Sequence, residues 1–353
     1  MNKTEFSAIV ERLTAGEIME KHHWLSLLSL PAGEEREALA TLAATVAREH
    51  FGRGVFVRGL VEISSYCKNN CYYCGLRCAN KEASRYRLTK EQILACCRQG
   101  AELGFNTFVL QGGEDPLQND RFITDVVAAI HREYPEKAIT LSVGERSREA
   151  YAAFRAAGAA RYLLRHETAS PSHYARLHPA SMSDAHRKQC LFTLKELGYQ
   201  VGSGMMIGSP WQTPEHIAED FVFLDELQPQ MIGIGPFIPA AGTPFATSPA
   251  GSAELTLLLL SLLRLRFPKA LIPATTALAT LLPDGMERGI LAGANVVMPN
   301  LSPMDVRDKY SIYNNKKSSG SESAQSLQLL AARLEEIGYH IDYGRGDYPQ
   351  TKF

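Results

Sequence analysis

The 353-residue sequence has almost no net charge and no long apolar run. Its formal charge is −1, so no basic field is available to hold nucleic acid or an anionic membrane. The longest apolar stretch, from Leu255 to Leu265, contains Ser261 and Arg264 and is far too short to cross a bilayer. The first residues also lack the apolar segment of a secretory signal. We therefore expect a cytoplasmic protein that binds neither nucleic acid nor membranes.

Cysteine is scarce, with 7 residues, and its number is odd. Three of these residues, Cys67, Cys71 and Cys74, are crowded into one short segment. An odd count and such crowding are untypical of a disulfide framework, and in a reducing compartment they indicate metal binding or catalysis.

From residue 55 onward, short apolar runs alternate with amphipathic helical patterns. This alternation predicts parallel strands joined by helices, and a count of eight predicts a closed barrel. The fold class is therefore α/β, a (β/α)8 TIM-type barrel. The eight expected strands cover residues 55–64, 107–111, 139–143, 161–166, 200–207, 231–236, 271–275 and 295–298.

Helical patterns flank this barrel on both sides. We expect an N-terminal helical extension at residues 1–54, the barrel at 55–300 and a C-terminal extension with a helix at 301–353. The last helix carries Leu327, Leu330 and Leu334 on one face. The polar residues from Gly344 onward are expected to be loosely held.

The three crowded cysteines form a C-x3-C-x2-C motif directly after the first expected strand. Loops after the strands of such a barrel open onto its catalytic face. Three thiolates satisfy three corners of a [4Fe–4S] cube and leave one iron open for a ligand. The alternative is zinc, but a structural zinc site needs four ligands, and the spacing to Cys78 departs from the usual paired pattern.

The motif and its place after the first strand resemble radical S-adenosylmethionine (SAM) enzymes. In those enzymes SAM binds the open iron, and one electron cleaves it to methionine and a 5′-deoxyadenosyl radical. The resemblance implies a [4Fe–4S] cluster on Cys67, Cys71 and Cys74. It also implies SAM as a second cofactor and an external electron donor.

Longer segments resemble the [FeFe]-hydrogenase maturases of the HydE type. They are YCxxNCxYCGLR, RYRLT, LQGGEDP, LLRHETA, LKELGY, GIGPFIP, IPATTA and NVVMPN, and the resemblance runs from about residue 20 to 340. It implies action of the adenosyl radical on a cysteine-bound iron carbonyl–cyanide precursor inside the barrel. Other hydrogenase maturases are then expected partners.

Several strand ends carry groups suited to SAM. Glycines such as Gly113 permit close backbone approach, and the carboxylate of Glu114 can accept from an ammonium group, which in radical SAM enzymes is that of the methionine moiety. The glycine-rich strand before Met206 can admit a flat ring, or its glycines simply allow tight packing. The residues expected at SAM are Tyr73, Gly112, Gly113, Glu114, Ser142, Glu145, Glu167, Arg187 and Met206.

The resemblance also implies a substrate cavity inside the barrel. Arg165 and Glu167 lie together at one strand end, where the alternative is a structural ion pair. Paired threonines such as Thr275 and Thr276 are also common in barrel cores, where the backbone satisfies their hydroxyls. The residues expected to line the cavity are Arg165, Thr140, Phe237, Thr275, Thr276, Met298 and Tyr310.

Three other functions stay open from the residues alone. A methylornithine synthase-type mutase would isomerise lysine, and a non-enzymatic carrier would only pass on a cluster. A biotin synthase-like enzyme needs further thiolates inside the barrel, whereas Cys96, Cys97 and Cys190 fall in expected helices as small apolar residues. The stretch after Tyr310 has no cysteine, so we expect a single cluster.

Overall fold

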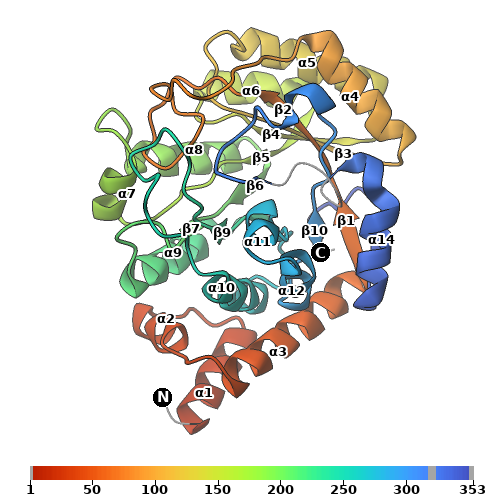
Figure 1. Ribbon diagram of the computed structural model, residues 1–353. Helices are drawn as coiled ribbons and strands as arrows, with labels where there is room; N and C mark the ends of the chain where they lie inside the picture. Colours follow the sequence, from red (N-terminus) through yellow and green to blue (C-terminus); the bar gives the residue numbers. More distant parts are fainter. Residues whose placement is uncertain (1–2, 317–322, 350–353) are drawn as a thin grey trace.

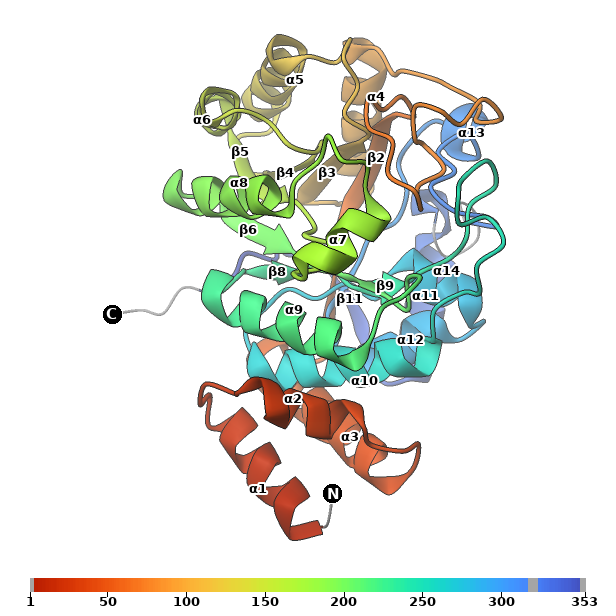
Figure 2. The same ribbon diagram turned by 90° about the vertical axis from the view of Figure 1, so that its left-hand side faces the viewer.

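The computed structural model describes residues 3–316 and 323–349. Its strands form a central barrel surrounded by helices, and the N-terminal helices extend from one side of it (Figures 1 and 2). No helix in the described part of the chain is long and apolar enough to span a membrane.

Most of the barrel is one parallel sheet of six strands, in the order β2-β3-β4-β5-β6-β8. Each strand follows its neighbour in the chain through a helical connection, as expected for right-handed βαβ units. These strands are β2 (Gly59–Ser64), β3 (Thr107–Gly112), β4 (Ala138–Ser142), β5 (Ala159–Leu163), β6 (Gln200–Ser203) and β8 (Met231–Ile232).

The ring is closed by shorter pairings. Leu271 pairs with Met231, and Pro273 pairs with Val296, both as isolated parallel bridges. β10 (Val296–Val297) then pairs with β1 (Gly54–Val57), which continues into β2. The expected strand at 271–275 is thus reduced to two bridge positions, because Pro273 has no N–H to donate to a ladder. The expected eight-stranded TIM-type barrel is confirmed.

Three expected strands are each split in two: residues 55–64 form β1 and β2, 200–207 form β6 and β7, and 231–236 form β8 and β9. β6 ends before Gly204, and β7 (Met206–Ile207) resumes on the far side to pair with β9 (Gly235–Pro236). A Cβ at Gly204 would lie 1.9 Å from the carbonyl oxygen of Gly233, and the φ angle of Gly204 is +157°. Only glycine permits this close approach of the two strands.

The helices form the outer layer and begin at typical capping residues. Five N-cap side chains each accept a hydrogen bond from a backbone N–H in the first turn of the following helix. They are Thr89, Asn119, Ser147, Ser183 and Ser252. The outer helices are α4 (Lys90–Glu102), α5 (Asp120–Glu133), α6 (Arg148–Ala157), α7 (Pro171–Leu177), α8 (Asp184–Glu196), α9 (Pro214–Leu227), α10 (Ala253–Arg266), α11 (Thr276–Leu281) and α12 (Gly285–Leu291).

Three N-terminal helices, α1 (Lys3–Thr14), α2 (Lys21–Leu28) and α3 (Glu34–Phe51), cover α9 and α10 (Figure 2). The indole of Trp24 on α2 is fully buried and stacks on Phe221 of α9, with ring centroids 4.1 Å apart. This extension therefore packs against the outer helices, and Phe51 at the end of α3 lies edge-on to Phe56 of β1.

The parallel register determines which side chains face the inside of the barrel. Glu62, Gln111 and Ser142 are register partners on β2, β3 and β4, so they lie on one level and point to the same side. One level below, toward the N-terminal ends of the strands, Val109 and Thr140 are partners in the same way.

The C-terminal extension returns to the barrel. After α13 (Met304–Arg307) and α14 (Leu327–Glu336), β11 (His340–Asp342) pairs in parallel with β1. The chain then continues below the barrel, where the fully buried Arg161 binds both the carbonyl oxygen of Arg345, at 2.9 Å, and the carboxylate of Asp347, at 2.7 Å. The expectation of a loosely held tail is therefore wrong up to residue 349, and residues 350–353 lie outside the described part.

Substitution of Asp347 by Asn is expected to lower the free energy of unfolding by about 1–2 kcal/mol, because Arg161 loses its carboxylate partner. The expected decrease in the free energy of unfolding is small because the Asp347 side chain is 40% exposed. Burial opposes ionisation of Asp347, but the hydrogen bonds from Arg161 and Gln200 and the charges of Arg161 and Arg345 together outweigh burial and lower its pKa. The stabilisation is thus present at neutral pH and is lost as the pH falls through that lowered pKa.

Urea unfolding at neutral and acidic pH measures this effect. Asp125→Asn, at an exposed position of α5, is the matched control and should leave stability unchanged. Equal stabilities of the Asp347→Asn variant and the unmodified protein at neutral pH would contradict this account of the barrel floor.

Candidate active site

The three motif cysteines lie on the loop after β2, at the carboxyl ends of the strands. All three are half-buried, whereas Cys78 is exposed. Burial raises the pKa of Cys67 and Cys71, and burial together with the charge of Cys67 raises the pKa of Cys74 to about 12. Half-buried thiols with raised pKa values need a cationic partner to become thiolates, so the chemistry of the loop fits a metal centre.

The cysteine loop is held by backbone hydrogen bonds from three other parts of the chain. The acceptors are backbone carbonyl oxygens: Lys68 N–H donates to that of Glu114, Tyr72 N–H to that of Leu177 and Gly75 N–H to that of Ile312, each at 2.9 Å. The loop is therefore fixed before any ligand binds, as a coordinating site requires.

Among the described residues, no group of three His, Cys, Asp or Glu side chains converges in a way that could hold one metal ion. A lone zinc ion needs its sulfur ligands about 2.3 Å from one point. A cube instead spreads its cysteines over separate iron atoms.

Glu114 and Glu145 connect the loops after β3 and β4. The Glu114 carboxylate accepts from the backbone N–H of Glu145, at 3.0 Å, and lies 3.2 Å from the Lys68 ammonium. Glu145 in turn accepts a short hydrogen bond from the buried Arg187 on α8. Burial opposes the charge of Arg187, but Glu145, Tyr174 and Tyr73 together outweigh burial and raise its pKa. Arg187 is therefore a permanent cation beside the cysteine loop.

Arg165 and Glu167 lie next to the Glu145–Arg187 pair. Arg187 donates to the carbonyl oxygen of Arg165, at 2.8 Å, and the Arg165 guanidinium lies 3.0 Å from the Glu167 carboxylate. The φ angle of Glu167 is +65°, a strained conformation for a residue with a side chain. Such strain is concentrated at functional sites, so the ion pair serves more than packing.

Tyr73 and Met206 belong to an apolar group under the cysteine loop, together with the buried Phe237. The Tyr73 hydroxyl lies 3.1 Å from Nε2 of His178. Burial and the charge of Arg187 lower the pKa of His178 to about 3, so its neutral ring accepts from Tyr73 while Nδ1–H donates to Tyr174. His178 was not singled out from the sequence, because it lies directly after α7, outside any motif.

The residues expected around a substrate are placed at two depths. Within the described part of the chain, the buried hydroxyls of Thr140 and Thr275 and the buried Nε of Arg165 have no hydrogen-bond partner. Such unsatisfied groups are typical of a binding cavity whose ligand is absent. Met298 lies deeper, packed against Met231, Leu271 and Val296.

The remaining residues expected at SAM or substrate are Tyr310, Thr276, Phe237, Gly112 and Gly113. The buried Tyr310 hydroxyl accepts from Gln111, at 3.3 Å, on the level of Ser142. Thr276 is the first residue of α11, and Phe237 groups with Tyr73 and Met206 rather than with the threonines. Gly112 and Gly113 run beside the cysteine loop, where a Cβ at Gly113 would lie 2.7 Å from Cβ of Cys67.

Comparison with known proteins agrees with this geometry. The model of the radical SAM superfamily matches residues 61–224, which cover the cysteine loop and most of the sheet. The [FeFe] hydrogenase maturase subunit HydE of Thermotoga maritima is 45% identical over 302 residues, 86% of this chain and 86% of that protein. The chain belongs to the HydE family of radical SAM enzymes.

More distant members of the superfamily share the fold. The 3-methylornithine synthase of Methanosarcina acetivorans is 30% identical over 93% of this chain and 92% of its own. A crystal structure of methylornithine synthase (PylB) superimposes with a TM-score of 0.84 at 29% identity, covering 95% of this chain and 97% of that one. The barrel of this HydE-family enzyme is thus common to enzymes with different products.

One further polar cluster was missed in the sequence. Glu62, fully buried on β2, forms an ion pair with Lys316, at 2.6 Å, and accepts from Asn300, at 2.9 Å. Burial raises the pKa of Glu62, and Lys316 and Asn300 oppose this increase. Alternation along the first strand would have identified Glu62 as an inward carboxylate, but nothing in the sequence indicated that Lys316 reaches it.

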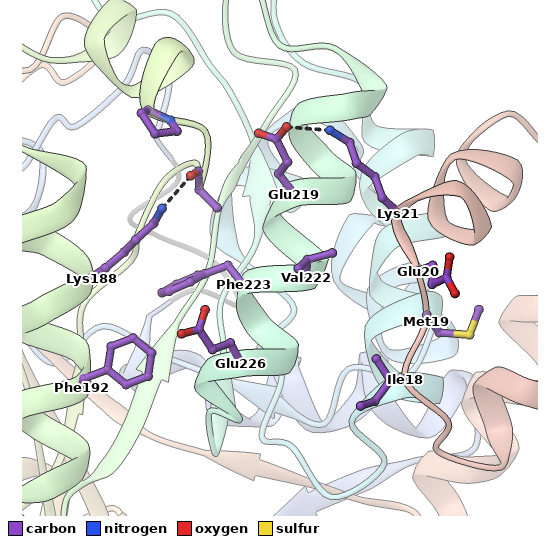
Figure 3. A pocket seen from close by; sticks show the side chains of 12 residues that line it. Ile18, Met19, Glu20, Lys21, Lys188, Phe192, Glu219, Val222, Phe223 and Glu226 are labelled. Atoms are coloured by element: carbon purple, nitrogen blue, oxygen red, sulfur yellow. Dashed lines mark hydrogen bonds and ion pairs between the residues drawn. The ribbon is translucent and has the colours of Figure 1, made fainter.

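A hollow of ≈720 Å³ lies outside the barrel, between α8, α9 and the residues before α2 (Figure 3). Lys21 pairs with Glu219 there, at 2.6 Å, and Lys188 donates to the carbonyl oxygen of Ala169, at 2.7 Å. None of the residues expected at SAM or substrate lines it, so this hollow is separate from the candidate active site.

Substitution of Gly113 by Ala is expected to reduce iron incorporation strongly, because the new Cβ would lie 2.3 Å from the carbonyl oxygen of Tyr66 and would displace the cysteine loop. Gly233→Ala is the matched control, since its Cβ would meet only an ordinary contact at 4.0 Å. Iron and sulfide per chain after anaerobic reconstitution measure the effect. Equal incorporation in both variants would show that the loop tolerates the shift.

Proposed function

We propose that this enzyme acts in maturation of the [FeFe]-hydrogenase active site, on a cysteine-bound iron carbonyl–cyanide precursor within the barrel. The observation that carries the proposal is the 45% identity to the HydE maturase over 86% of the chain. The polar residues at the strand ends, with partnerless hydroxyls below them, support a ligand inside the barrel.

A [4Fe–4S] cluster on Cys67, Cys71 and Cys74, with SAM on its open iron, would supply the 5′-deoxyadenosyl radical. The protein itself would bind and orient SAM and shield the radical. Arg187 is a fixed cation suited to the SAM carboxylate, and Glu114 and Glu167 are carboxylates suited to its ammonium and ribose groups. Tyr73, Met206 and Phe237 supply an apolar wall for the adenine.

The inner groups suit a polar, anionic substrate. The partnerless Nε of Arg165 and the hydroxyls of Thr140 and Thr275 are hydrogen-bond donors below the SAM residues. A cyanide- and carboxylate-bearing precursor would accept from them. Met298 lies at the deeper end, where it would contact the apolar part of the substrate.

The main alternative is a mutase that isomerises lysine, because 3-methylornithine synthase shares the barrel. Its 30% identity is well below the 45% of the maturase. Biotin synthase chemistry is disfavoured because Cys96, Cys97 and Cys190 are buried in the packing between helices and sheet. Incubation with lysine, and separately with the cysteine-bound iron precursor, would distinguish the two functions. Methylornithine formation would overturn the maturase proposal.

Replacement of Cys67, Cys71 or Cys74 by Ala is expected to abolish reductive SAM cleavage, because each thiolate holds one iron of the cluster. Cys78→Ala, at an exposed position next to the motif, is the matched control and should retain cleavage. Formation of 5′-deoxyadenosine under reducing conditions is the measurement. Full cleavage by any of the three motif variants would contradict the assignment of the ligands.

A further inference from the structure

One fully buried carboxylate has no part in the site described above. Asp220 lies on the outer helix α9, and burying a carboxylate is costly unless it is hydrogen-bonded. Its Oδ1 lies 3.2 Å from Nε2 of His166 and accepts a short hydrogen bond from the backbone N–H of Ala169. Within the described part of the chain, its Oδ2 has no hydrogen-bond partner. Both hydrogen bonds of this carboxylate therefore go to the segment that follows β5.

Glu167 lies between the two residues that Asp220 binds. Its φ angle is +65°, a left-handed conformation that persists for such a residue only where the surrounding structure enforces it. The N–H of Glu167 donates to the carbonyl oxygen of Gly204, at 3.1 Å, and its carbonyl oxygen accepts from Met206 N–H, at 3.3 Å. These bonds hold Glu167 itself, whereas Asp220 holds the chain immediately before it and two residues after it.

His166 connects the outer helix to the strands. Its ring is buried, and Nδ1 lies 2.9 Å from the hydroxyl of Ser203 on β6. The ring also lies edge-on to Phe223 of α9, with centroids 4.9 Å apart. Because both ring nitrogens have partners and an aromatic ring packs against the imidazole, the chain is fixed just before Glu167.

Ala169 is held by two outer helices. Its N–H donates to Asp220 of α9, and its carbonyl oxygen accepts from Lys188 of α8, at 2.7 Å (Figure 3). The neighbouring Arg187 of α8 donates to the carbonyl oxygen of Arg165, at 2.8 Å. The segment from Arg165 to Ala169 is thus fixed from outside the barrel, and Asp220 binds it at two points.

We propose that Asp220 is a positioning residue for SAM, which holds Glu167 in its left-handed conformation through His166 and the Ala169 N–H. The Glu167 carboxylate is thereby directed at the SAM ribose. This inference rests on the proposed function, because it takes Glu167 as a SAM residue. Asp220 acts through these two contacts from the outer layer of the barrel, so it takes no part in the chemical step.

Loss of Asp220 should affect SAM binding more than SAM cleavage. Rotation at Glu167 would relieve its strained conformation and turn its carboxylate away from the ribose. The cysteine loop would stay in place, because it is held by separate backbone hydrogen bonds. Removal of an interaction made equally in the ground state and the transition state raises KM and leaves kcat unchanged.

Two substitutions of Asp220 separate positioning from stability. Asp220→Leu keeps the branched shape without an acceptor and is expected to raise KM for SAM about tenfold, with kcat unchanged. Asp220→Asn keeps a carbonyl oxygen for both hydrogen bonds and should restore the KM. Both variants should lower Tm, because each leaves buried polar groups unpaired. Initial rates of 5′-deoxyadenosine formation by the reconstituted, reduced enzyme at varied SAM concentration give both constants.

The matched control is Asp225→Leu on the same helix, where Asp225 pairs with Arg266 of α10. It should lower Tm and leave KM for SAM unchanged. If Asp220→Leu does not fold, His166→Leu, which keeps the Ala169 hydrogen bond, is expected to raise KM about threefold.

Four results would overturn the inference. They are an unchanged KM in Asp220→Leu (or in His166→Leu where it replaces that variant), a fall in kcat at constant KM, an equal increase in KM in the Asp225→Leu control, and failure of Asp220→Asn to restore the KM. A tenfold increase in KM that Asn reverses, at similar losses of Tm, supports it.

Glu167→Gly distinguishes failure of this inference from failure of the proposed function. Glycine adopts a φ angle of +65° freely, so this substitution removes the carboxylate without adding strain. If it leaves KM for SAM unchanged, the proposed role of Glu167 and the inference fail together. If it raises KM and Asp220→Leu does not, only the inference fails. Asp220→Leu added to Glu167→Gly should raise KM no further, and a further increase would contradict action through Glu167.

Discussion

The hydrogen-bonded ring of parallel strands determines which side chains can act together. In parallel register, partners on neighbouring strands lie on one level, so Glu62, Gln111 and Ser142 face the interior side by side. The ring also brings the carboxyl ends of all strands to one end of the barrel. The cysteine loop, the Gly-Gly-Glu segment and the Arg165–Glu167 pair, far apart in sequence, thereby become neighbours.

The charges at this end are balanced pairwise, as Arg161 and Asp347 are at the opposite end. Glu145 stabilises Arg187, Glu167 stabilises Arg165, and Lys316 stabilises Glu62. Charges with fixed partners keep their orientation, so a ligand meets preorganised groups rather than mobile ones. The thiols lack such partners and have raised pKa values, which is the condition that a bound metal cluster relieves.

The sequence predicted those features that depend on local pattern. Hydrophobic alternation located the strands and helices, and the spacing of Cys67, Cys71 and Cys74 identified the loop. Features that depend on long-range contact were missed: the reach of Lys316 to Glu62, the hydrogen bond between Tyr73 and His178, and the packing of the tail on Arg161. The residue roles at SAM and substrate stay predictions, because sequence position and proximity alone do not establish binding.

Electron paramagnetic resonance of the anaerobically reconstituted, reduced enzyme, with and without SAM, tests the central claim most directly. The account predicts a [4Fe–4S]⁺ signal that shifts when SAM is added, because three cysteines leave one iron open to it. A reduced cluster whose signal is unchanged by SAM, or no cluster signal at all, would contradict it.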